Sequence, residues 1–199
     1  DPCVPSTMVH RQLPETVLLL LVSSTIFSLE PKRIPFQLWM NRESLQLLKP
    51  LPSSSVQQCL AHRKNFLLPQ QPVSPHQYQE GQVLAVVHEI LQQIFTLLQT
   101  HGTMGIWEEN HIEKVLAALH RQLEYVESLG GLNAAQKSGG SSAQNLRLQI
   151  KAYFRRIHDY LENQRYSSCA WIIVQTEIHR CMFFVFRFTT WLSRQDPDP

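Results

Sequence analysis

Cysteines are the residues of this 199-residue chain with the most evident chemistry. Cys169 and Cys181 lie twelve residues apart on one predicted helix, about 18 Å at a rise of about 1.5 Å per residue. The Cα atoms of a disulfide lie within about 7 Å, so these two cannot pair. Cys3 lies before Met8, in a stretch that we interpret below as an extension, and is not counted. Any bond must therefore join Cys59 to Cys169 or Cys181. We predict Cys59–Cys169 with Cys181 unpaired, because Cys169 begins its helix beside a loop, whereas Cys181 falls on a core stripe. A Cys59–Cys181 bond and the absence of any bond are the alternatives.

The other polar residues form no recognisable catalytic or metal-binding motif. The sequence lacks HExxH, GxSxG, a glycine-rich phosphate-binding loop and a CxxC pair. His88, His111 and His120 fall on two predicted helices, where chance surface positions explain them better than a zinc site does. Glu108 and Glu109 are first-turn acids that favour the dipole of their helix rather than an acid–base pair. We therefore predict no enzyme activity, no metal and no cofactor.

Composition excludes further classes of protein. Hydrophobic residues make up 43% of the chain and charged residues 17%, which excludes a charge-rich disordered protein. Eighteen Lys and Arg against 16 Asp and Glu give a formal net charge of +2, so we predict no nucleic-acid partner. Lys151, Arg155 and Arg156 give one predicted helix a basic face, which is either a solvated surface or a protein-binding patch.

The first 28 residues are predicted to lie outside the folded domain. Residues 1–7 precede Met8, and we interpret them as an added or upstream-translated extension. Residues 8–28 contain a basic start, an apolar run at 17–22 and small residues before Ser28, which is the pattern of a secretory signal peptide. An uncleaved anchor or a buried first helix is the alternative. We expect residues 29–199 to form a single secreted, extracellular domain that does not insert into a membrane.

The remaining sequence is predicted to be helical throughout. Apolar residues recur at spacings of three and four, as in Leu84, Val87, Leu91, Ile94 and Leu98, and no stretch alternates with a period of two. Such stripes suit helices that pack on one another. The five predicted helices span residues 35–51, 75–100, 107–129, 142–164 and 167–194.

The lengths of the connections predict the type of bundle. Residues 52–74 form a long first crossover, whereas residues 101–105 and 165–166 are short turns that make those helix pairs antiparallel. Long crossovers combined with short turns are typical of growth-hormone and cytokine bundles, and simple up-down bundles have short turns throughout. We therefore predict an all-α, cytokine-type bundle of five helices with a long crossover after the first helix.

One segment carries a family resemblance. The run Tyr153 to Leu161, YFRRIHDYL, is followed after seven residues by Cys169-Ala170-Trp171, and this resembles the type I interferon signature at every defined position. The runs 59–66 (CLAHRKNF) and 88–95 (HEILQQIF) agree with the same family. The resemblance covers residues 29 to about 194.

Details within the resemblance point to one part of the family. Many alpha-type members have four cysteines and two bonds, whereas this chain lacks a cysteine at its predicted mature start and near the turn at 101–105. Residues 63–70 and 159–164 are most similar to one branch of the family whose members have a single bond. The resemblance therefore implies one disulfide.

The resemblance implies a ligand for the two chains of the type I interferon receptor. In the family, one receptor chain is bound tightly and the other weakly, and the apposed receptor tails activate kinases that start antiviral and innate immune signalling. The tight site lies on the loop after the bonded cysteine and on the outer face of the last helix, here Leu60, Arg63, Thr176, His179 and Arg180. The weak site lies across three helices, here Phe95, Thr96, Thr100, His111, His120 and Lys151.

Leu116 also maps to the weak site, but it lies on the core stripe of its helix and we interpret it as a core residue. We expect the folded chain to be a monomer. Two alternatives remain for the function: a helical cytokine of another receptor family, or a secreted carrier of a small apolar ligand in an internal cavity.

Overall fold

The computed structural model describes the greater part of the predicted folded domain. Contacts divide the chain into two compact units, residues 1–33 and 34–199. The predicted extension, the predicted signal peptide and most of the first predicted helix lie outside the described residues. The residues that the structure describes all belong to the second unit and are 42–44, 46, 48, 53–69, 80–102, 107–130 and 141–195.

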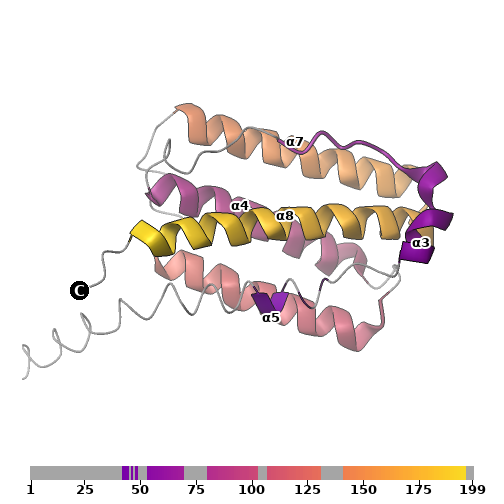
Figure 1. Cartoon of the computed structure of the whole chain (residues 1–199), viewed down its shortest axis with the longest axis horizontal. Helices are drawn as coiled ribbons and strands as arrows, with labels where there is room; N and C mark the ends of the chain where they lie inside the picture. The colour runs from indigo at the N-terminus through magenta and orange to yellow at the C-terminus, as the bar shows by residue number, and fades with distance from the viewer. Residues whose placement is uncertain are drawn as a thin grey trace, which may run out of the picture. The chain divides into compact units, whose positions relative to one another are not determined.

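Helices make up most of this described part of the chain, which contains no strand (Figure 1). The predicted all-α class is therefore confirmed. Residues 42–44 and 46 are helical, within the first predicted helix. The long helices are α4 (Glu80–His101), α5 (Glu109–Ser128), α7 (Ser141–Asn163) and α8 (Ser168–Gln195).

The long crossover is more structured than the sequence analysis expects. It contains a short helix, α3 (Ser53–Gln58), followed by a 3-10 turn, η2 (Leu60–His62). Three consecutive serines begin α3 and no apolar stripe runs through it, so helical periodicity gives no signal there. Both elements contact α8, whose packing supplies the stability that the local sequence lacks.

Helices α4 and α8 form the centre of the bundle. Helix α4 packs against α5, α7 and α8, and α7 also packs against α8. Buried residues such as Leu91 and Ile94 on α4, and Trp171 and Ile178 on α8, contribute about 1.5–3 kcal/mol each through removal from water. Helices α4 and α8 are long and apolar enough to cross a membrane by composition, and most of each is buried in the bundle. Their apolar character therefore reflects contact with several neighbouring helices.

A four-residue turn reverses the chain between α7 and α8. The Tyr166 N–H donates to the Leu161 carbonyl (2.8 Å) and the Arg165 N–H donates to the Glu162 carbonyl (2.9 Å). This is the pattern of a Schellman motif, which satisfies the last carbonyls of a helix. Arg165 and Tyr166 have φ angles of 50° and 54°, in the left-handed region that non-glycine residues seldom adopt. The surrounding contacts must hold them there.

One of those contacts is an aromatic cluster at the same end of the bundle. The His101 ring at the end of α4 lies 4.8 Å from the Tyr166 ring and 5.9 Å from the His158 ring on α7. Burial lowers the pKa of His158, the neighbouring His101 lowers it further, and Asp159 acts in the opposite direction. The neutral form of His158 is therefore the form that the fold favours.

This cluster makes the stability of the protein fall in acid. Because the pKa of His158 is lower in the folded than in the unfolded chain, the unfolded state binds more protons below about pH 6.5. The contribution of His158 is present in full above that pH and is lost as the pH falls from there through the lower pKa of the folded state. We expect the midpoint of urea unfolding to fall between about pH 7.5 and about pH 5, and to fall less for His158→Gln than for the parent chain. His179→Gln, at a partly exposed position, is the control and should keep the full difference; equal differences in all three proteins would contradict the assignment.

Candidate functional site

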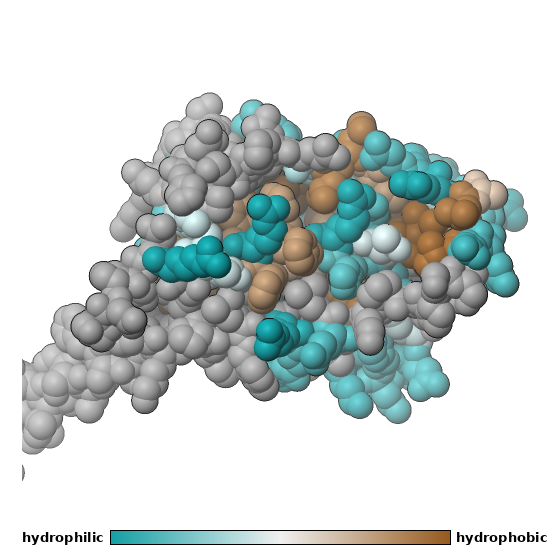
Figure 2. Space-filling view, viewed as in Figure 1, coloured by the Kyte–Doolittle hydropathy of each residue, from teal (hydrophilic) through white to brown (hydrophobic). Residues whose placement is uncertain are grey.

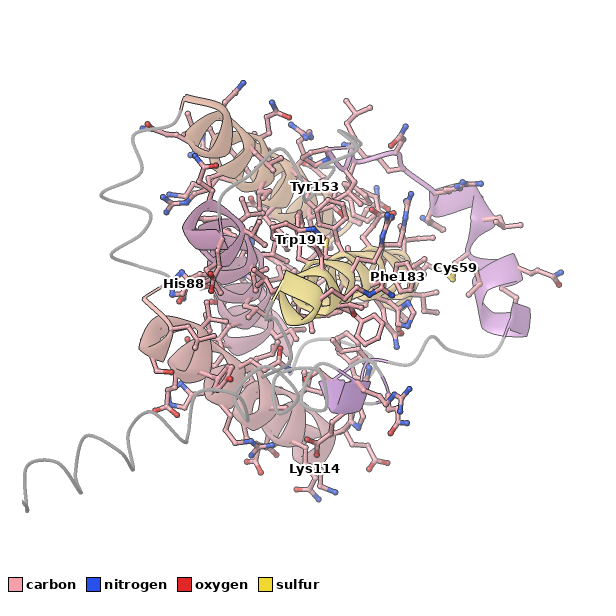
Figure 3. The ribbon with its side chains drawn as sticks, turned by 60° about the vertical axis from the view of Figure 1, so that its left-hand side comes forward. Cys59, His88, Lys114, Tyr153, Phe183 and Trp191 are labelled. Atoms are coloured by element: carbon pink, nitrogen blue, oxygen red, sulfur yellow. A yellow bond between two sulfur atoms is a disulfide. The ribbon has the colours of Figure 1, made fainter. Side chains whose placement is uncertain are left out.

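A disulfide joins the crossover to the start of α8. Cys59 and Cys169 are bonded with their Cα atoms 5.2 Å apart, across 110 residues of sequence (Figure 3). This is the pairing that the cysteine spacing predicts, and Cys181 is free and buried. Burial raises the pKa of the Cys181 thiol to about 12, so the thiol stays protonated. The closed loop is long enough for the bond to stabilise the fold by about 4 kcal/mol on the chain-entropy model.

Hydrogen bonds from α7 fix the chain that follows the disulfide. The Tyr160 hydroxyl donates to the His62 carbonyl (2.7 Å). The Arg156 guanidinium donates from Nε to the Phe66 carbonyl (2.9 Å) and from Nη2 to the Leu67 carbonyl (3.3 Å). His62 ends η2, and Phe66 and Leu67 belong to the irregular stretch that follows it, so α7 satisfies backbone groups that would otherwise need water.

Phe66 anchors the same stretch in the core. Its side chain is 1% exposed, and its ring packs edge-on against Tyr160 (5.1 Å between centroids) and Tyr153 (6.5 Å). Beyond it, Leu67 adopts a φ of 56° and its N–H donates to Asn65 Oδ1 (3.0 Å). We call residues 59–67 the pinned segment, because the disulfide, the α7 hydrogen bonds and Phe66 hold it at three points.

The predicted tight-site residues lie on the pinned segment and on α8. Leu60 and Arg63 are exposed at η2, and Leu60 keeps 53% of its surface in solvent. On α8, Thr176 and Arg180 are exposed and His179 is partly exposed. Because η2 contacts α8 and the disulfide ends at its first turn, the outer residues of α8 follow at about 10–16 Å along the helix axis. Figure 1 shows α3 at this end of α8.

The outer stripe of α8 mixes hydrophobic and cationic side chains. Phe183 is 53% exposed, one turn beyond His179 and Arg180, and the exposed Arg187 follows it. Figure 2 shows this face, with hydrophobic side chains between hydrophilic ones along the course of α8. An aromatic flanked by arginines is a composition enriched at protein–protein contacts.

Below this stripe lies a carboxylate that the sequence analysis misses. Glu177 is 7% exposed; its Oε1 pairs with Arg180 Nη1 (3.0 Å), and its Oε2 accepts a hydrogen bond from the Tyr153 hydroxyl (2.6 Å). Burial is the largest cause that raises the pKa of Tyr153, and Cys181 and Glu177 add to it, so Tyr153 remains a donor. The i, i+3 spacing of Glu177 and Arg180 is a signal that could have identified the pair.

The predicted weak-site residues spread over α5, α4 and α7. Thr96 and Thr100 are exposed on α4, and the Thr100 hydroxyl donates to the Thr96 carbonyl (2.8 Å). The Phe95 ring lies 6.2 Å from the His120 ring of α5, so the structure brings these two residues together. His111 is partly exposed near the start of α5, nine residues before His120 and therefore about 14 Å away along the helix.

Lys151 lies on the other side of α4. Its Nζ is 3.7 Å from Glu89 Oε2, and Arg147 Nη2 is 3.2 Å from the same oxygen. Gln93 donates to the second oxygen of Glu89 (2.9 Å).

Leu116 is half-buried against the core, in agreement with its interpretation as a core residue.

The histidines considered for a metal have other partners. His88 Nε2 lies 2.9 Å from Glu127 Oε1, which joins α4 to α5, and His120 Nε2 lies 3.4 Å from Glu124 Oε1. Within the described ranges no group of three His, Cys, Asp or Glu side chains could hold a metal ion.

Comparison with known proteins gives a consistent result. The family model for the interferon alpha/beta domain matches residues 34–192. Interferon epsilon of Homo sapiens is 59% identical over 189 residues, which cover 94% of this chain and 91% of that protein. Interferon epsilon of Sus scrofa is 55% identical over 193 residues, which cover 96% of this chain and all of that protein. Interferon beta of Tachyglossus aculeatus aculeatus is 31% identical over 191 residues, 94% of this chain and all of that protein.

The branch that residues 63–70 and 159–164 resemble is interferon epsilon. The higher identity to the two epsilon interferons than to the beta interferon confirms that prediction.

Arg156→Ala should release the pinned segment while the helices stay formed. The variant loses the charged hydrogen bonds to the Phe66 and Leu67 carbonyls, so backbone amides of residues 62–67 should exchange with deuterium roughly tenfold faster or more. Amides of α4 and α8 should exchange at the parent rate. Arg155→Ala removes the exposed neighbouring arginine and serves as the control. Parent-like exchange of residues 62–67 in Arg156→Ala would contradict the role of Arg156.

Proposed function

We propose a receptor-bridging function from the premise that this chain belongs to the type I interferon family and is a cytokine, not an enzyme. In this proposal the protein is secreted after removal of residues 8–28 and acts outside the cell. It binds one chain of the type I interferon receptor through the pinned segment and α8, and the other chain through α5, α4 and α7. The apposed receptor tails then activate their kinases for antiviral and innate immune signalling.

The pinned segment is the observation that carries the proposal. A receptor surface assembled from a loop and a helix binds well only if the loop is ordered before the partner arrives, because ordering on binding lowers affinity. Cys59–Cys169 and Arg156 hold the loop in place beside α8. Leu60 then serves as an exposed apolar anchor, and Arg63 and Arg180 can donate charge-assisted hydrogen bonds to receptor carboxylates.

The second face has the character of a weaker contact. Thr100 and Lys151 each have an intramolecular partner, and His120 pairs with Glu124. Phe95 is half-buried against the core, so it presents less apolar surface than Leu60 does. A partner therefore gains less from the hydrophobic effect on this face than at Leu60.

The carrier alternative gains no support from the cavity beside the pinned segment. That cavity lies among Leu68, Ile90 and Phe184 and has a volume of about 10 Å³. This is about the space of one water molecule and far below that of a small apolar ligand.

Direct binding tests the proposed function. Residues 29–199, with the Cys59–Cys169 bond formed, should bind each purified ectodomain of the type I interferon receptor saturably, and one more tightly than the other. Surface plasmon resonance with each ectodomain immobilised separately measures both affinities. A monomeric, helical preparation with its disulfide intact that binds neither ectodomain would refute the proposal.

Substitution of the two arginines tests the tight face. Arg63→Ala or Arg180→Ala should each weaken binding to the tight receptor chain by about 1–3 kcal/mol, with helicity unchanged by circular dichroism. Lys114→Ala is the control, because it removes the same charge from an exposed site on α5, away from Cys59 in Figure 3. Unchanged affinity in both arginine variants would show that this face is mapped wrongly.

A further inference from the structure

Glu177 lies between the core and the proposed tight face. In the described part of the chain, Glu89 and Glu177 are the buried carboxylates. A buried carboxylate is costly unless its oxygens are hydrogen-bonded and its charge is paired. Glu177 meets both conditions, with the Tyr153 hydroxyl on Oε2 at 2.6 Å and the Arg180 guanidinium on Oε1 at 3.0 Å. Loss of either the Tyr153 hydroxyl or the Arg180 guanidinium would leave an oxygen of Glu177 buried without a hydrogen-bond partner, which is energetically unfavourable.

Tyr153 connects Glu177 to the pinned segment. Its ring packs edge-on against Phe66 (6.5 Å) and against Phe154 (5.2 Å), and Cys181 Sγ lies 3.8 Å from its hydroxyl oxygen. These contacts leave the hydroxyl directed at Glu177 in a fixed position. A continuous set of contacts therefore runs from Phe66 in the pinned segment through Tyr153 and Glu177 to Arg180.

One N–H group of Arg180 is bound to Glu177, and the rest of its guanidinium lies at the surface. Its side chain is 53% exposed, whereas that of Glu177 is 10% exposed. A guanidinium has five N–H donors, so the bond to Glu177 leaves donors at the surface for a partner's carboxylate. An arginine that is already oriented loses less rotamer freedom when it binds than a free one does.

We infer that Glu177 and Tyr153 are positioning residues of the tight face, which orient Arg180 toward a receptor carboxylate. This inference rests on the proposed function. It assigns to two buried residues a role in affinity that neither could have by touching the receptor. It also makes the pinned segment and the α8 stripe parts of one supported surface.

A double-mutant cycle tests this role. Glu177→Gln keeps the size of the side chain and removes its charge, and it should weaken binding to the tight receptor chain about 3- to 10-fold. In the Arg180→Ala background the same substitution should change the affinity less than about twofold, because its effect passes through Arg180. Glu113→Gln, an exposed carboxylate on α5, is the matched control for charge and should bind as the parent chain does.

Tyr153→Phe keeps both Glu177 and Arg180 and removes only the hydroxyl. It should weaken binding to the tight receptor chain when Arg180 is present and have little effect in the Arg180→Ala background. If Glu177→Gln folds poorly, Tyr153→Phe still provides the test. The Arg180 side-chain Nε–H signal in a nitrogen-15 NMR spectrum gives a readout without the receptor. Its order parameter should fall in both Glu177→Gln and Tyr153→Phe, whereas a purely structural role would leave it unchanged in any variant that folds.

The outcomes separate this inference from the proposed function. If Arg180→Ala weakens binding but Glu177→Gln and Tyr153→Phe do not, the positioning role is wrong and the tight face stands. If Glu177→Gln weakens binding equally with and without Arg180, Glu177 acts by another route and the inference is again wrong. If Arg180→Ala binds as the parent chain does, the positioning role is wrong, whereas the tight face is wrong only if Arg63→Ala also binds as the parent chain does.

Discussion

The attachment of the crossover to the α7–α8 end of the bundle is the constraint on which the rest of the structure depends. A segment with one buried aromatic and no strand partner has little reason to be ordered by itself. The Cys59–Cys169 bond fixes its start, and Arg156 and Tyr160 of α7 satisfy its carbonyls. The exposed residues of η2 thereby gain a defined position beside the outer stripe of α8. Without this attachment the residues of η2 would lose their defined position beside α8, and with it half of the proposed tight surface.

Buried carboxylates serve the two proposed faces in the same way. Glu177 lies below Arg180 on α8, and Glu89 of α4 lies below Lys151 and Arg147 of α7. In each case a carboxylate removed from water binds a cation that stays partly exposed. The negative charge of each carboxylate is neutralised below the surface by its cation. The cation keeps further N–H donors at the surface for a receptor chain.

Sequence patterns predicted the parts of this structure that depend on local periodicity. The four long helices follow apolar spacings of three and four. The distance between Cys169 and Cys181 along a helix excludes a bond between them, and the place of Cys169 at the start of its helix favours it over Cys181 as the partner of Cys59. The pattern missed α3 and η2, because their order comes from contacts with α8 rather than from their own residues. It also missed Glu177, whose partner Tyr153 is 24 residues away in sequence, and the Glu89–Lys151 pair between two helices. Such pairings depend on how helices face one another, which the spacing within each helix does not specify.

The buried thiol of Cys181 has a consequence for how the protein is handled in an oxidising medium. Thiol–disulfide exchange requires a thiolate that can reach a sulfur atom of the bond, and burial denies Cys181 both ionisation and access. The native molecule therefore carries a free thiol without scrambling its own bond or linking to a second copy. In an unfolded molecule the Cys181 thiol is exposed and can attack the Cys59–Cys169 bond of its own chain or of a second copy, so mispaired bonds and covalent dimers record the history of unfolding in a preparation.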